Sequence, residues 1–200
     1  MIIVGLTGSI GMGKSATAQM FMDAGIPVFD SDATVHKLQA KDGDAIQLIE
    51  AAFPGVTMNG DLDRAKLGAI VFADVSEKKK LEAIIHPMVN EKRISFFERA
   101  EREDAAFVVL DVPLLFETSG DKGCHKVVVV SAPEDVQRER VLARSNMTVE
   151  KFEHILEQQT PDKEKRARAD YVVETDKGLE YAEKQVAQII EDIKKEAANA

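Results

Sequence analysis

The sequence predicts an α/β fold in which a parallel five-stranded sheet is covered by helices on both faces. Three observations lead to this expectation. Five short apolar runs, rich in β-branched residues, recur along the chain, and helical stretches separate them. The runs are apolar throughout rather than alternating, which is typical of parallel strands buried on both faces. The length of 200 residues suits one domain that carries small inserted lobes.

The predicted strands alternate with helices along the chain. In order they are Ile2–Leu6, Ile26–Phe29, Phe107–Leu110, Lys126–Val130 and Tyr171–Val173. A helix over Lys14–Ala24 follows the first strand almost directly. The last helix is expected from about residue 178 to residue 196, because its apolar residues recur at helical spacing and form one face.

Between the second and third predicted strands lie about 75 residues with helical periodicity and no strong strand signal. That is long for a single crossover. Helix-breaking residues interrupt the pattern twice, first over residues 54–60 and again at His86-Pro87. We therefore predict a helical insertion over about residues 31–104 that forms a small substrate lobe within one domain covering residues 1–200.

Two further helices are expected between the fourth and fifth strands. Pro133 begins one that extends to about Arg144, and Thr148 is a suitable N-cap for the next, which extends to about Gln159. We interpret this pair as part of a lid over about residues 134–168.

Composition and charge exclude several classes of function. The net charge of −9 argues against a nucleic-acid polymer or a basic membrane anchor as partner. No apolar run reaches the roughly 18 residues of a membrane span, and the chain begins with a strand-like run instead of a secretory signal. A single cysteine, Cys124, indicates a reducing compartment, so we expect a cytoplasmic protein. The oligomeric state does not follow from the sequence.

The strongest motif is the segment from Gly8 to Ser15, which fits the pattern G-x-x-x-x-G-K-[ST] between a predicted strand and a predicted helix. Its glycines permit a tight loop whose N–H groups converge on phosphate oxygens. Lys14 is expected to reach the β- and γ-phosphates, and the Ser15 hydroxyl to ligate Mg²⁺. The expected nucleotide-binding residues of this loop are Gly8, Gly11, Met12, Gly13, Lys14, Ser15 and Ala16.

This loop predicts a nucleoside triphosphate ligand but not a reaction. The guanine-specific motif Asn-Lys-x-Asp is absent from the sequence, and the chain is short for a motor or transporter module. A small-molecule kinase is the class that remains. Five of the nine arginines fall between residues 138 and 168, which indicates a local site for anions.

Carboxylates follow two of the predicted strands. Asp30 and Asp32 close the second strand, and Asp111 ends the third. Because the carboxyl ends of parallel strands line the ligand crevice, Asp32 is our candidate for the base that accepts the proton of a hydroxyl acceptor. Asp30 either supports Mg²⁺-bound water or caps the next helix, and both residues being caps is an equal alternative. Asp111 is expected to support Mg²⁺, and Glu117 to face solvent.

Taken together, these motifs resemble the dephospho-CoA kinase family. The resemblance spans residues 2 to about 175 and rests on five segments in order. They are Leu6–Ser15, Phe29–Asp32, Ile85–Pro87, Asp111–Glu117 and Ala169–Val173. The phosphate loop alone is shared by many kinases, whereas the other four segments are far more specific.

The resemblance implies a P-loop kinase core with a CoA-binding lobe and a lid, and phosphorylation of the ribose 3′-hydroxyl of dephospho-CoA by ATP with Mg²⁺. It implies that Asp32 is the catalytic base and that Arg140, together with Arg144, closes over the phosphates. His86 is assigned to the substrate lobe or to structure. Lys165, together with its two neighbouring arginines, either extends the basic pocket or lies on the surface.

Two positions depart from the family pattern. Ala16 stands where the family usually has threonine, and Thr175 stands where it commonly has asparagine, which affects any adenine contact there. Two alternatives stay open at this point. One is another nucleoside monophosphate or small-molecule kinase, and the other is a nucleotide-dependent binding protein without turnover.

Overall fold

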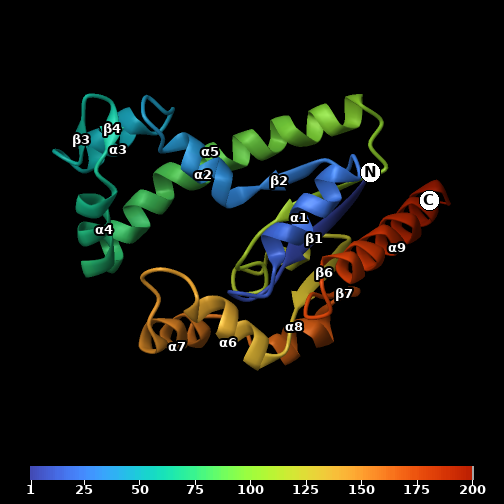
Figure 1. Ribbon diagram of the computed structural model, residues 1–200. Helices are drawn as coiled ribbons and strands as arrows, with labels where there is room; N and C mark the ends of the chain where they lie inside the picture. The colour runs from blue at the N-terminus through green and yellow to red at the C-terminus, as the bar shows by residue number, and fades with distance from the viewer. Residues whose placement is uncertain (200) are drawn as a thin grey trace. The chain divides into compact units, whose positions relative to one another are not determined.

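The computed structural model describes residues 1–199, and its main element is a parallel sheet of five strands in the order β2-β5-β1-β6-β7 (Figure 1). The predicted α/β class and the five strands are confirmed. The strands are β1 (Ile2–Thr7), β2 (Val28–Asp30), β5 (Phe107–Asp111), β6 (Lys126–Ser131) and β7 (Tyr171–Glu174). Since β1 lies at the centre, the loop that follows it opens in the middle of the carboxyl edge of the sheet.

Contacts divide the described chain into two compact units. The first contains residues 1–29 together with the described residues from 100 onward, and the second is Asp30–Arg99. The helices of the first unit are α1 (Lys14–Asp23), α6 (Glu134–Leu142), α7 (Val149–Glu157), α8 (Asp162–Arg168) and α9 (Leu179–Ala198), and a short 3₁₀ turn spans Gly120–Gly123. Figure 1 shows α1 and α9, which pack against each other.

Alternate residues of the central strands enter two different cores. Val128 and Val130 of β6 belong to a cluster with apolar residues of α1 and α9. Their neighbours Val127 and Val129 belong to a second cluster with Leu115. Because successive side chains of a strand point to opposite faces, a strand that is buried on both sides must be apolar at every position. This explains the continuous apolar runs in the sequence.

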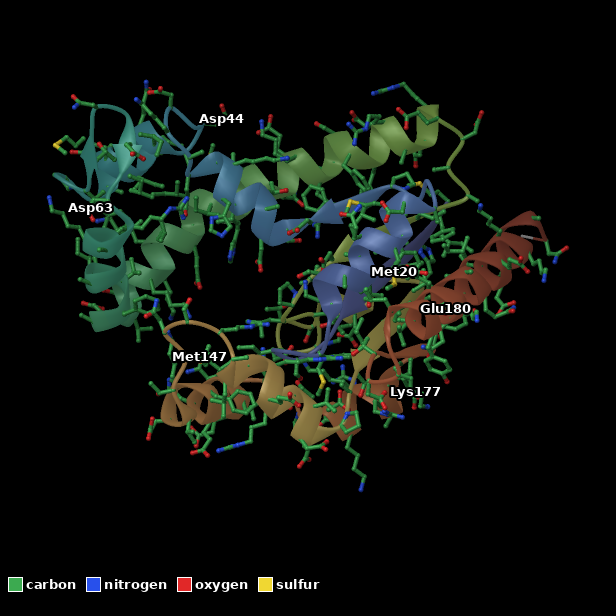
Figure 2. All side chains as sticks on the ribbon, viewed as in Figure 1. Met20, Asp44, Asp63, Met147, Lys177 and Glu180 are labelled. Carbon is green, nitrogen blue, oxygen red and sulfur yellow. The ribbon has the colours of Figure 1, made fainter. Side chains whose placement is uncertain are left out.

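The second unit has a core of its own. Its elements are α2 (Ser31–Leu38), α3 (Ile46–Ala52), β3 (Thr57–Met58), β4 (Asp61–Leu62), α4 (Arg64–Ala73) and most of α5 (Val75–Arg102). Leu38, Ile49 and Phe53 are almost fully buried in one cluster. Side-chain hydrogen bonds and ion pairs also stabilise the surface of this unit. Asp63 caps α4 through Lys66 N, and Lys92 Nζ pairs with Asp44 Oδ2 at 2.8 Å; Figure 2 labels both aspartates.

The expected break over residues 54–60 is confirmed, because α3 ends at Ala52 and α4 begins at Arg64. Between them β3 and β4, which were not predicted, pair as an antiparallel hairpin with Asn59 and Gly60 at positive φ in its turn.

The second expected break was wrong, because α5 continues through His86 and Pro87. Apolar residues on both sides of the proline, Ile85 and Met88 among them, pack into the cluster of the second unit. This packing outweighs the single backbone hydrogen bond that proline removes.

The two predicted helices after β6 are present, with Thr148 at the N-cap of α7, where its side chain accepts from Lys151 N at 3.2 Å. The loop between them carries Met147 (Figure 2). A third helix, α8, was not predicted. It begins after Pro161 and is too short to show a periodic pattern of its own. Among residues 1–199, no helix is long and apolar enough to cross a membrane.

The proline inside α5 leads to a test of stability. We expect Pro87→Ala to raise the free energy of unfolding by about 2 kcal/mol, because proline costs about 3 kcal/mol relative to alanine inside a helix. Its stiffening of the unfolded chain offsets less than about 1 kcal/mol of that cost. Urea denaturation followed by circular dichroism measures the change. Lys79→Ala, at an exposed position of α5, is the control. A less stable Pro87→Ala variant would mean that the proline ring makes a stabilising contact.

Candidate active site

The loop between β1 and α1 has the backbone shape of an anion site. Gly11 has φ 80° and Gly13 has φ 96°, a region that residues with a Cβ rarely adopt. A Cβ on Gly11 would collide with Val141 of α6, and one on Gly13 would lie 3.2 Å from the Thr175 side chain. Gly13 is the N-cap of α1 and offers no side chain to its first turn. The N–H groups that begin this helix are therefore available to an anion.

Lys14 and Asp111 meet at the carboxyl edge of the sheet. Lys14 is the first residue of α1, Asp111 is the last residue of β5, and Lys14 Nζ donates to Asp111 Oδ1. The Asp111 side chain is only 3% exposed. A buried carboxylate is stable only with cationic or hydrogen-bonding partners. The structure thus brings together two of the predicted site residues, one at the start of α1 and one at the end of β5.

The residues predicted for Mg²⁺ fit a metal that is shared with phosphate oxygens. Ser15 is exposed in the first turn of α1, next to Lys14, which is paired with Asp111. Among residues 1–199, no group of three or more histidine, cysteine, aspartate or glutamate side chains is arranged to hold a metal ion. Mg²⁺ normally takes one or two protein oxygens and completes its shell with water and substrate phosphates. One hydroxyl and one carboxylate suit that pattern.

The two carboxylates after β2 have different roles in the structure. Asp30 is the N-cap of α2, and its side chain accepts from Ala33 N at 2.8 Å. Asp32 lies in the first turn of α2 with an exposed side chain. The cap alternative therefore holds for Asp30, whereas Asp32 is the carboxylate of this pair that does not form the N-cap.

Arg140 is fixed beside the phosphate loop by Thr175. The two terminal nitrogens of Arg140 donate to Thr175 Oγ1 at 2.8 Å and to Thr175 O at 2.7 Å. The Thr175 hydroxyl in turn donates to Met12 O at 2.8 Å. Thr175, which departs from the family pattern, thus connects the end of β7, the helix α6 and the phosphate loop.

Two cavities adjoin the loop, and their charges differ. The smaller, of about 220 Å³, is lined by Arg140 and Arg144 together with Gly11, Gly13 and Ala16. Met20 of α1, labelled in Figure 2, also lines it. Among residues 1–199 its lining contains no carboxylate. A positive cavity of this size beside the phosphate loop suits part of a nucleotide.

The larger cavity, of about 810 Å³, is lined by Ser9, Met12 and residues from the segment after β6. Its charged residues balance. They are Glu134, Asp162, Glu174 and Asp176 against Arg138, Lys163, Arg166 and Lys177. Figure 2 labels Lys177, in the loop before α9. Despite its size, this cavity lacks the net positive charge that a polyphosphate needs.

Glu117 and Lys165 form a buried ion pair that contradicts two expectations. Glu117 was expected to face solvent, but its side chain is 15% exposed and its Oε1 lies 3.0 Å from Lys165 Nζ. Lys165, expected in a basic pocket or on the surface, is fully buried. Thr160 N also donates to Glu117 Oε1, at 2.7 Å. The pair therefore fastens the start of α8 to the segment after β5.

The surroundings of Glu117 change its acidity. Burial raises the pKa of the Glu117 carboxyl, but hydrogen bonds from its own and the Thr160 N–H, with the hydrogen bond and charge of Lys165, lower it more. The net result is a pKa below the ordinary value of 4.5. This carboxylate consequently stabilises the fold above that pH, and its contribution is lost as the pH falls through the lowered pKa.

Sequence reasoning missed two residues that touch the loop. Gln137 of α6 and Gln159 after α7 both bind the backbone of Ile10, and glutamine in a helical pattern carries no signal of such a role. Predicted residues from Gly8 to Ala16 do meet Arg140 and Arg144 in one unit, whereas Asp32 belongs to the unit Asp30–Arg99.

A phosphate loop at the central strand, a buried carboxylate on the next strand and a positive cavity define a P-loop kinase of small molecules. The dephospho-CoA kinase family model matches residues 2–180. A dephospho-CoA kinase of Bradyrhizobium diazoefficiens is 54% identical over 195 residues, which cover 98% of this chain and 97% of the relative.

Solved structures share the fold of this chain. The crystal structure of TT1252 from Thermus thermophilus is 35% identical, has a TM-score of 0.80, and the match covers 94% of this chain and 95% of that one. Dephospho-CoA kinase from Campylobacter jejuni, 22% identical over 96% of each chain, shares the fold with a TM-score of 0.64. The chain belongs to the dephospho-CoA kinase family, and it is a kinase of the last step of coenzyme A biosynthesis.

The buried pair leads to a prediction for stability and its pH dependence. Lys165→Met should lower the free energy of unfolding at pH 7.5 by about 2–3 kcal/mol, because it leaves the buried Glu117 carboxylate without its cation. The difference from the wild type should begin to shrink as the pH falls below about 4.5, because Glu117 of the variant becomes protonated there, whereas the lowered pKa keeps the wild-type carboxylate charged to lower pH. Urea denaturation at pH 7.5 and pH 4.0 measures both effects.

Lys163→Met, at an exposed position of α8, is the matched control for this experiment. It should change the free energy of unfolding by less than about 0.5 kcal/mol at either pH. A difference between Lys165→Met and wild type that stays constant down to pH 4.0 would contradict the role of the Glu117 charge.

Proposed function

We propose that this protein transfers the γ-phosphoryl group of ATP to the ribose 3′-hydroxyl of dephospho-CoA in the cytoplasm, with Mg²⁺ as the metal. The observation that carries the proposal is the meeting of Lys14, the uncapped start of α1 and Asp111 at the carboxyl edge of the sheet. The family of the chain supports the acceptor. The single cysteine supports a reducing compartment.

The triphosphate is proposed to lie on the loop from Gly8 to Ser15. Loop N–H groups and Lys14 bind the phosphate oxygens, and the small positive cavity with Arg140 and Arg144 receives the base side of the nucleotide. Such preorganised donors stabilise charge that develops on the transferred group. The pair of Lys14 and Asp111 supports this, because it holds the ammonium group at the mouth of the loop.

Asp32 is proposed to accept the proton of the 3′-hydroxyl. Both aspartates are exposed, but Asp30 is committed to the N-cap of α2, so Asp32 is proposed as the carboxylate of this segment that meets the acceptor. The unit Asp30–Arg99 is proposed as the CoA-binding lobe, and α6 to α8 as the lid. A correctly placed carboxylate orients the hydroxyl in line with the γ-phosphate.

Ser15 and Asp111 are the residues that would hold Mg²⁺, directly or through water. The ion would neutralise charge on the β- and γ-phosphates when bound. Asp111 also holds Lys14, so its carboxylate orients the lysine side chain toward the loop.

The role of Asp32 as the base can be tested by comparing a substitution at Asp32 with one at Asp30. We expect Asp32→Asn to lower kcat at least about 100-fold, because loss of a general base typically costs that much, while the affinity for ATP stays within about threefold. Asp30→Ser retains a side chain able to cap α2 and should keep kcat near that of the wild type. Steady-state kinetics and ATP titration measure the two effects. A kcat of Asp32→Asn near that of the wild type would remove Asp32 from the mechanism.

The reaction itself is tested with purified protein, ATP, Mg²⁺ and dephospho-CoA. We expect one coenzyme A and one ADP per turnover, with the new phosphate on the ribose 3′-oxygen in the phosphorus NMR spectrum. AMP replaces dephospho-CoA in a parallel assay. Turnover of AMP without turnover of dephospho-CoA would instead support a nucleoside monophosphate kinase, and ATP binding without transfer to either would support a binding protein.

A further inference from the structure

The backbone N–H and C=O of Ile10, in the phosphate-binding loop, are each hydrogen-bonded to a glutamine side chain. Gln137 Nε2 donates to Ile10 O at 2.7 Å, and Ile10 N donates to Gln159 Oε1 at 3.1 Å. The two glutamines are 127 and 149 positions away from Ile10 in the sequence. Each comes from a different part of the segment that contains α6 and α7.

Both glutamines are themselves held in place. Gln137 is 4% exposed in the first turns of α6, and its own N–H donates to Pro133 O at 2.9 Å. Gln159 directly precedes Thr160, whose N–H is bound by Glu117, the partner of the buried Lys165. The buried ion pair therefore fixes the backbone next to Gln159. Two side chains that are themselves held in place thus hold the backbone of one loop residue.

The polarity of the two contacts is set by the backbone. The Ile10 N–H can only donate and its carbonyl can only accept, so Gln159 must present its oxygen and Gln137 its nitrogen. A carboxylate in place of the amide would still accept from the N–H, but it could not donate to the carbonyl. The two positions therefore differ in which substitutions they tolerate.

We propose that Gln137 and Gln159 are positioning residues that hold the Ile10 backbone and thereby keep the N–H groups of the phosphate loop aimed at the phosphates. The glycines on either side of Met12 leave this loop flexible without support. Donors that are already aimed need no reorganisation during the reaction. The proposal rests on the proposed function, since it assigns to these residues a part in binding ATP.

The same contacts make the loop depend on the helices that follow β6. Gln137 belongs to α6, and Gln159 follows the end of α7. A shift of either helix must move the Ile10 backbone or break a hydrogen bond. ATP binding and the arrangement of α6 and α7 are thus linked through the backbone of one loop residue.

The first experiment compares Gln159→Leu with Gln158→Leu. Gln158 is exposed, and its Nε2 contacts the His154 ring at 2.8 Å, so the control makes the same change one residue away. We expect Gln159→Leu to lower kcat/KM for ATP about three- to tenfold, the effect of one hydrogen bond. The KM for dephospho-CoA should stay within about twofold, and Gln158→Leu should match the wild type.

The hydrogen bond between Ile10 N and Gln159 can be measured directly in the substrate-free protein by hydrogen exchange followed by NMR. Exchange of the Ile10 amide should become at least about threefold faster in Gln159→Leu. The Val109 amide of β5, which is bonded to Pro27 O, should keep its rate. If the substitution only destabilised the fold, the amides of both Ile10 and Val109 would exchange faster.

The second experiment compares Gln159→Glu with Gln137→Glu at pH 8. Both substitutions keep the shape of the side chain and add one negative charge beside the backbone of Ile10. Because only Gln137 has to donate, Gln137→Glu should have a kcat/KM for ATP at least about threefold below that of Gln159→Glu. Ile10 should stay protected from exchange in Gln159→Glu.

Two results would overturn the proposal. One is an Ile10 exchange rate and a kcat/KM for ATP in Gln159→Leu that equal those of the wild type. The other is equal impairment of the two glutamate variants. Should Gln137→Glu fail to fold, the exchange rate of Ile10 in Gln159→Leu still decides. Exchange needs no substrate, so a wild type that does not phosphorylate dephospho-CoA would overturn the proposed function without affecting this measurement.

Discussion

The tight passage from β1 into α1 is the constraint on which the rest of the structure depends. Gly11 and Gly13 take positive φ, and a Cβ at either position would meet α6 or Thr175 at close range. The segments after β6 and β7 therefore pack directly on the loop backbone. This close approach allows Gln137, Gln159 and Thr175 to bind the loop by hydrogen bonds. Phosphate binding at this loop thus depends on packing as much as on charge.

A protein of net charge −9 is proposed to bind two polyphosphates, and the distribution of charge explains how. Net charge governs solubility and long-range attraction, whereas a ligand responds to the field of its own pocket. The 220 Å³ cavity beside the loop collects two arginines, while the 810 Å³ cavity has equal numbers of acidic and basic residues. Volume alone favours the larger cavity, whereas charge favours the one next to Arg140 and Arg144, where we propose that the nucleotide binds.

Contacts between groups far apart in the sequence explain much of what the sequence did not reveal. Glu117 was expected to face solvent, and Lys165 to extend a basic pocket or lie on the surface. In the fold they neutralise each other and fasten the start of α8. Pro87 is a similar case, because local preference predicts a helix break and the core on both sides of it retains the helix. Local rules fail at these positions because the deciding partner is distant in the sequence.

The sequence by itself determined the parallel strands, the phosphate loop and the family. Each of these is encoded locally, by continuous apolar runs, by glycines in register with Lys14 and by short ordered motifs. Only the tertiary structure decided that Asp30 is a cap, that Glu117 pairs with Lys165 and that two glutamines hold Ile10. The physical reason is that a hydrogen bond or ion pair forms between groups close in space, and for most of these contacts the chain brings residues together across more than 40 positions.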